Sequence, residues 1–123
     1  MLYVEDNPAN VRLMRSIVAR RPGVELHTVG NGEEALTMAS TAAFDLVLLD
    51  LHLPDVHGED VLRRLRTQPT TASVPVVVLT ADASAEARDR VTMLGADAFL
   101  LKPVDVGEVL HWIDHPNGAR ADG

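Results

Sequence analysis

The sequence predicts an α/β protein built on a doubly wound parallel sheet of five strands with helices on both faces. Short apolar runs alternate with segments of helical periodicity along the 123 residues. Such alternation with short connections is typical of β-α units around a parallel sheet. Four of the apolar runs end in polar side chains, namely Glu5-Asp6, Asp50, Thr80 and Lys102. Because the carboxyl ends of parallel strands meet at one edge of a sheet, we expect these side chains to lie together.

The predicted strands differ in polarity. Segments 45–50 and 74–80 are nearly continuous apolar runs, as expected for central strands that are buried on both faces. Segment 24–29 alternates polar and apolar residues, which predicts a strand at the edge of the sheet. In chain order, the strands are expected at residues 2–4, 24–29, 45–50, 74–80 and 98–101.

Capping residues and apolar spacing predict five helices. The first begins at Asn7-Pro8, a helix cap followed by a proline in the first turn, and is predicted to end at Pro22-Gly23. The last begins at Asp105, and its apolar residues recur at intervals of three and four, which line one helical face. The other three helices are expected at 33–41, after Gly58, and from Asp82 or Ser84 to Gly95.

The edge position of segment 24–29 determines the strand order. The order 2-1-3-4-5 places this second strand at an edge and gives the flavodoxin-like form of the doubly wound fold. It also creates a switch point between strands 2–4 and 45–50, where ligands bind beyond the carboxyl ends of the strands. Asp6 and Asp50 flank that point.

Residues 1–114 are predicted to form one domain, since a chain of this length can bury a core and no linker interrupts it. Residues 115–123 have no apolar pattern, which predicts a flexible C-terminal tail. In the helix after Gly58, the arginines at positions 63, 64 and 66 are expected to form a solvated helix face.

Composition and charge argue against several classes of protein. A formal net charge of −7 argues against direct binding of nucleic acid, which requires clustered Lys and Arg. With no cysteine, there are no disulfides or thiol ligands. No apolar run approaches the length of about 20 residues that spans a bilayer, and no signal peptide is recognisable. We therefore expect a cytoplasmic protein with no membrane partner.

The polar strand ends predict a metal-dependent acceptor of a phosphoryl group. Two carboxylates about 4 Å apart repel by about 4 kcal/mol at an effective dielectric constant of 20, so Glu5, Asp6 and Asp50 need cations nearby. Mg²⁺ suits such oxygen ligands, with Mn²⁺ as a substitute, and Lys102, the single lysine of the chain, adds one positive charge. Asp50 ends the most central strand and is the candidate nucleophile. Thr80 can donate its hydroxyl to a phosphoryl oxygen.

These residues resemble the motifs of the receiver domain of two-component response regulators, the CheY-like family. The resemblance runs from Leu2 to about Asp114. The matching segments are Tyr3-Val4-Glu5-Asp6-Asn7, residues 48–54 closing at Gly58, Leu79-Thr80-Ala81 and residues 95–103. Segment 2–10 is also similar to receiver domains at the C-terminus of hybrid histidine kinases.

The resemblance implies roles for particular residues. Asp50 would accept a phosphoryl group from a histidine kinase or a histidine phosphotransfer protein in a Mg²⁺-dependent phosphorelay. The implied metal ligands are Glu5, Asp6, Asp50 and the backbone carbonyl of His52. Thr80 and Lys102 would contact the phosphoryl group, Phe99 would be the aromatic switch residue, and the Lys102-Pro103 bond would be cis. The side chains of His52 and Asp82 are expected to tune the lifetime of the phosphorylated form.

The resemblance also implies a signalling output rather than an enzyme that turns over a free metabolite. The output surface is expected on the face formed by the fourth helix, fifth strand and fifth helix, and to bind a downstream protein. Two alternatives remain open. One is a docking module that works without phosphorylation, and the other is an Asp-nucleophile phosphatase. Phosphatases of the haloacid dehalogenase type need a second Asp two residues after the nucleophile, where this chain has His52.

Overall fold

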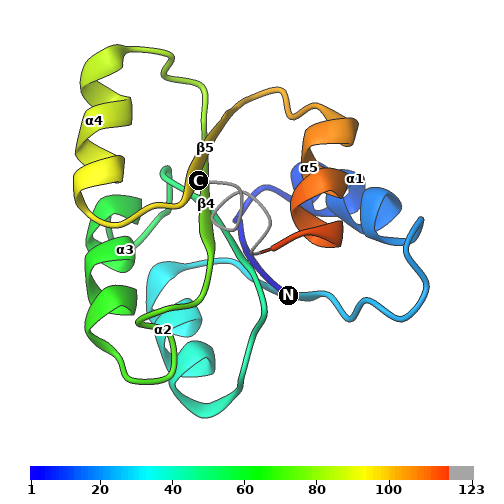
Figure 1. Cartoon of the computed structure of the whole chain (residues 1–123), viewed down its shortest axis with the longest axis horizontal. Helices are drawn as coiled ribbons and strands as arrows, with labels where there is room; N and C mark the ends of the chain where they lie inside the picture. The colour runs from blue at the N-terminus through cyan, green and yellow to red at the C-terminus, as the bar shows by residue number, and fades with distance from the viewer. Residues whose placement is uncertain (117–123) are drawn as a thin grey trace.

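A five-stranded parallel sheet lies between two layers of helices, with α2, α3 and α4 on one face and α1 and α5 on the other (Figure 1). This computed structural model describes residues 1–116. The strands are β1 (Leu2–Val4), β2 (His27–Val29), β3 (Val47–Asp50), β4 (Val76–Thr80) and β5 (Ala98–Leu101). The helices are α1 (Pro8–Val18), α2 (Gly32–Thr41), α3 (Gly58–Thr67), α4 (Ala85–Met93) and α5 (Val106–Asp114).

The strand order is β2-β1-β3-β4-β5, and all four pairings are parallel. The predicted fold class and order are therefore confirmed. The switch point falls between β1 and β3, as expected from this order. Val4 pairs with Leu49, so the residues that follow these two positions, Glu5 and Asp50, are brought to the same edge of the sheet.

Strand β2 is shorter than the predicted segment 24–29. Its three residues pair with the three residues of β1, and before the strand the Met1 amino group reaches this segment, where it donates to the Glu25 carbonyl at 2.7 Å. Residues 24–26 therefore precede the strand. Val24 donates its backbone N–H to Arg21 in the turn after α1, and α1 itself ends at Val18, ahead of the predicted Pro22-Gly23 stop.

The alternation of side chains along each strand divides the core into two apolar layers. On one face, Val47, Leu49 and Val78 pack among buried residues of α2, α3 and α4. On the other face, Leu48 and Leu79 pack among buried residues of α1 and α5. Burial on both faces explains why the central strands have continuous apolar sequences.

Side-chain caps begin four of the five helices where the sequence predicts them. Asn7 accepts a hydrogen bond from the N–H of Ala9 at the start of α1. The corresponding caps of α2, α4 and α5 are Asn31, Ser84 and Asp105. These caps satisfy backbone donors that have no intrahelical partner, and each of these four helices starts within a few residues of the preceding strand end.

One arginine of α3 departs from the sequence-based prediction. Arg63 and Arg64 are exposed, but the Arg66 side chain is only 18% exposed and forms an ion pair with Asp97 at 2.8 Å. Its guanidinium also donates to the carbonyls of Gly95 and Val74. The prediction of a solvated arginine face is therefore wrong for Arg66, because α3 packs with this position against the turn before β5.

Helix α5 ends at Asp114, and the predicted C-terminal tail, residues 115–123, lies mostly outside the residues that the structure describes. Residues 117–123 lie outside the described residues. Across residues 1–116, none of the helices is long and apolar enough to span a membrane.

Candidate functional site

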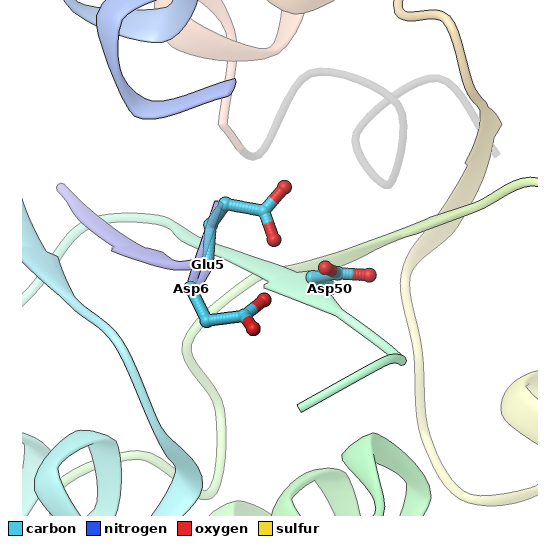
Figure 2. Close-up of side chains that lie close together, drawn as sticks. All are labelled: Glu5, Asp6 and Asp50. Carbon is cyan, nitrogen blue, oxygen red and sulfur yellow. The ribbon is translucent and has the colours of Figure 1, made fainter. Parts of the chain in front are cut away.

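Three carboxylates converge where β1 and β3 end. Glu5 and Asp6 follow β1 and extend toward Asp50, the last residue of β3 (Figure 2). One carboxylate oxygen from each residue lies within 4.8 Å of the other two. Glu5 and Asp50 are buried, whereas Asp6 is exposed, so the cluster has one side open to solvent. The predicted gathering of these three side chains is present in the structure.

Lys102, which follows the edge strand β5, reaches this cluster with its side chain. Its Nζ lies 3.2 Å from Glu5 Oε1 and 3.1 Å from Asp50 Oδ2. The backbone N–H of Lys102 donates to the carbonyl of Thr80. This hydrogen bond continues the β4–β5 ladder by one residue. One ammonium therefore faces two buried carboxylates, and the three acidic groups together exceed the local positive charge.

The buried carboxyl of Glu5 reflects this excess of negative charge. Burial raises the pKa of Glu5, and interaction with the Asp50 carboxylate raises it further, while Asn10 and Lys102 act in the opposite direction. Oε1 accepts hydrogen bonds from Asn10 and Lys102, whereas Oε2 is buried and has no hydrogen-bond partner among the described residues. Burial of a carboxylate oxygen without a hydrogen-bond partner costs free energy, and a bound cation or a proton on this oxygen would remove that cost.

Asp50 is held by its own loop as well as by Lys102. Its Oδ1 accepts the backbone N–H of His52 at 3.1 Å, a local turn that fixes the carboxylate at the strand end. Gly58, at the start of α3, packs closely against this turn. A Cβ at position 58 would lie 2.5 Å from Leu51 Cα and 2.8 Å from the Asp50 carbonyl oxygen, so the loop closes around the acidic residue only with glycine there.

The remaining predicted site residues lie on β4 and β5. Thr80 is buried at the end of β4, and its Oγ1 accepts the N–H of Asp82. Phe99 is half-buried, and the guanidinium of Arg88 lies over its ring at 5.4 Å from the centroid. The Lys102–Pro103 peptide bond is cis. Asp50 and Thr80 thus end β3 and β4, and Lys102 directly follows the adjacent strand β5.

The donor set fits Mg²⁺. Carboxylate oxygens on a partly open edge are the ligands of hard divalent cations that keep some of their water, and the described cluster contains no sulfur or imidazole ligand. Glu5 Oε2 supplies a buried oxygen that no donor of residues 1–116 satisfies. Glu5, Asp6 and Asp50 are therefore the residues that could hold the ion, and Mn²⁺ can occupy similar oxygen sites.

Two polar partners of Glu5, Asn10 and Tyr3, were not predicted from the sequence, where neither residue was given a role at the site. In the structure, Asn10 Nδ2 donates to Glu5 Oε1 at 2.5 Å and Tyr3 Oη lies 3.5 Å from the same oxygen. Their spacing offers a signal in hindsight, since residues 3 and 5 share one face of a strand and residue 10 is in the first turn of the adjoining helix.

Comparison with known proteins assigns the chain to a family. The model of the response regulator receiver domain matches residues 1–114. The chain belongs to this family. The resemblance found in the sequence is therefore confirmed, and the chain is a receiver domain of the kind used in two-component signalling.

Relatives of known sequence and structure agree with this assignment. The polar-differentiation response regulator DivK of Brucella anthropi is 33% identical over 113 residues, which cover 92% of this chain and 91% of that protein. The receiver domain of the sensor histidine kinase PA1611 from Pseudomonas aeruginosa, solved with a magnesium ion coordinated in its active-site cleft, is 30% identical with a TM-score of 0.83 and 93% coverage of both chains. A CheY-like receiver domain protein from Methanospirillum hungatei has a TM-score of 0.86 at 26% identity, covering 99% of this chain and 96% of that one.

Proposed function

We propose that this receiver domain takes a phosphoryl group onto Asp50 in a Mg²⁺-dependent phosphorelay and thereby switches a protein-binding surface. The observation that supports the proposal most is the position of the Asp50 carboxylate. It lies between the Lys102 ammonium at 3.1 Å and two further carboxylates within 4.8 Å. Without a bound metal ion, the three carboxylates at this edge repel a phosphoryl group. With a divalent cation bound, the edge attracts the phosphoryl group.

The residues of this chain have distinct parts in the transfer. An Asp50 oxygen attacks phosphorus as the N–P bond of a donor phosphohistidine breaks, so the electron pair of that bond stays on the imidazole and an acyl phosphate forms. Lys102 faces a phosphoryl oxygen, and the Thr80 hydroxyl donates to another. Glu5, Asp6 and Asp50, with the His52 carbonyl as a further ligand, would hold Mg²⁺, and the bound ion would supply positive charge beside the phosphoryl oxygens. The magnesium ion in the active-site cleft of the similar PA1611 receiver domain supports a Mg²⁺ site in this chain.

The proposed partners follow from the donor and from the exposed surface. The donor is a histidine kinase or a histidine phosphotransfer protein. The proposed output face is formed by α4, β5 and α5, where Met93 and Leu101 are large apolar side chains exposed by 87% and 42%. Phe99 on the same face, with Arg88 stacked over it, is the proposed switch residue. The domain acts as a signalling module, since its product stays on its own aspartate.

The test is the intact mass of the protein after incubation with acetyl phosphate and Mg²⁺. Wild type is expected to gain one phosphoryl group, and Asp50→Asn is expected to gain none. Omission of Mg²⁺ with a chelator present should also abolish the adduct. A wild-type protein that remains unmodified but still binds a partner through the α4–β5–α5 face would instead support the docking module, and steady release of phosphate from a small phosphate ester would support the phosphatase.

A further inference from the structure

The carboxylate of Glu5 is bound on one side only. Oε1 accepts from Asn10 Nδ2 at 2.5 Å and from Lys102 Nζ at 3.2 Å, and Tyr3 Oη lies at 3.5 Å. Oε2 is also buried and has no partner among residues 1–116. Three donors on one oxygen and none on the other fix the orientation of the group. The arrangement is costly unless the second oxygen has a ligand.

This asymmetry arises from local sequence. Asn7 caps α1, which therefore begins at Pro8, and Asn10 falls in its first turn with its amide directed back to the end of β1. Tyr3 and Glu5 are two positions apart in an extended segment, so their side chains share one face of the sheet. The Tyr3 ring is buried, and a buried phenol hydroxyl usually finds a polar partner. Glu5 is that partner.

We propose that Asn10, assisted by Tyr3, is a positioning residue for the metal site, and that it leaves Glu5 Oε2 as the oxygen that ligates the cation. This inference rests on the proposed function, because it concerns the same Mg²⁺ site. A glutamate has one more rotatable bond than an aspartate and loses more rotamer freedom when it is fixed. A side chain already held in its binding conformation loses less of that freedom when the ion binds.

The test is Mg²⁺ affinity measured by calorimetry on the Asn10→Leu variant. Leucine has a similar size and a higher helix propensity than asparagine, so α1 stays intact while the donor to Oε1 is lost. The dissociation constant for Mg²⁺ is expected to rise about tenfold, the effect of one hydrogen bond to a charged group. Tyr3→Phe, which removes a longer contact, is expected to raise it about twofold to threefold.

A double-mutant cycle separates positioning from general damage. In a Glu5→Asp background, the side chain is one methylene shorter and we expect its contact with Asn10 to be lost, so Asn10→Leu should change the dissociation constant by less than about twofold. Equal losses in the wild-type and Glu5→Asp backgrounds would overturn the inference. Asn31→Ala, which removes the cap of α2 away from the site, is the matched control and should leave Mg²⁺ affinity unchanged.

A spectroscopic readout reports on the same contact directly. Tyr3 is the single tyrosine of the chain, so the tyrosine band of the near-ultraviolet difference spectrum on addition of Mg²⁺ is assignable to it. Wild type should show a tyrosine difference signal that saturates with the ion, and Asn10→Leu should show it only at higher concentrations. If wild type binds Mg²⁺ and Asn10→Leu binds equally well, the positioning role is refuted while the proposed function stands. If wild type binds no Mg²⁺, both are refuted.

Discussion

The two ends of the sheet each contain a partly buried ionic cluster, and the clusters differ in how far their carboxylates are paired with positive charge and hydrogen-bond donors. At the amino end of β4, Arg66 pairs with Asp97, and Asp97 also accepts the N–H of Val76. At the carboxyl end, Lys102 faces Glu5 and Asp50, with Asp6 close by.

The balance of charge separates the two clusters. The amino-end cluster pairs one guanidinium with one carboxylate. The guanidinium also donates to the backbone carbonyls of Thr71, Val74 and Gly95. The carboxyl-end cluster has one cation for three carboxylates, and one buried oxygen of Glu5 has no partner within the described part of the chain. A cluster whose charges balance stabilises the fold, whereas a cluster with an excess of negative charge is suited to bind a cation.

Loss of the arginine at the amino end should lower stability most. Arg66→Met leaves the Asp97 carboxylate buried without its cation, and such a change typically costs about 3–5 kcal/mol of unfolding free energy. Urea unfolding monitored by the single tryptophan, Trp112, measures it. Under conditions in which Arg66→Met is folded, its affinity for Mg²⁺ should equal that of wild type. A loss below about 1 kcal/mol, the range of an exposed pair, would show that the amino-end cluster is not a structural one.

Gly58→Ala should cause the second-largest loss of stability, because it alters the loop that holds Asp50. The added Cβ would lie 2.5 Å from Leu51 Cα, and this contact is with backbone that cannot rotate away. A loss of about 1–3 kcal/mol is expected, together with weaker Mg²⁺ binding because the Asp50 turn shifts. Chemical denaturation with and without Mg²⁺ gives both quantities. Wild-type affinity for Mg²⁺ in this variant would mean that the loop does not position Asp50.

Glu5→Gln should affect stability in the direction opposite to Arg66→Met. It removes one of the crowded negative charges while keeping the shape and the contact with Asn10, so the metal-free protein is expected to gain about 1 kcal/mol. The added stability that Mg²⁺ gives to wild type should be lost. Thermal unfolding at several Mg²⁺ concentrations measures the two effects. A variant that is destabilised without the ion would contradict the excess of negative charge inferred for this end.

The pH dependence should show the same excess of negative charge. Because burial raises the pKa of Glu5, the folded state binds a proton more readily than the unfolded state does. The stability contributed by this proton is present below the ordinary pKa of glutamate and is lost as pH rises through the raised pKa. Mg²⁺ competes with the proton, so stabilisation by Mg²⁺ should fall as pH decreases through that same range. Thermal scans across pH, with Glu5→Gln as the control, test this. Identical pH profiles for wild type and variant would count against it.

The smallest effect is expected at the surface of α3. The ion pair of Arg63 with Asp60 has side chains 60% and 47% exposed, so Arg63→Ala should change unfolding free energy by less than about 1 kcal/mol. It is the matched control for Arg66→Met, since both changes remove one arginine from the same helix. A loss as large as that of Arg66→Met would show that burial does not explain the difference.

The carboxyl-end residues could be predicted because each ends an apolar strand. Asp50 and Thr80 stand out as polar residues directly after runs that are buried on both faces, and parallel pairing places such ends together. The strand order followed from the polarity of segment 24–29. The length of β2 did not, because Glu25 and His27 alternate with apolar residues across 24–29 whether or not each position pairs, and only His27–Val29 pair with β1.

The partners of these residues were harder to predict. Arg66 and Asp97 are 31 positions apart, and nothing in their local sequence indicates that α3 and the turn before β5 meet with these side chains facing each other. Asn10 has an ordinary place in an amphipathic helix, and Tyr3 counts as apolar in a strand pattern. Their contact with Glu5 depends on side-chain directions that periodicity does not specify.

The metal site can be located by diffraction from crystals grown with Mn²⁺, because anomalous scattering identifies the ion and its ligands. We expect one Mn²⁺ at the carboxyl end of the sheet, ligated by Glu5, Asp6 and Asp50, with Glu5 contributing Oε2. An ion bound elsewhere, or a site that stays empty at millimolar Mn²⁺ with the three carboxylates still converged, would contradict this expectation.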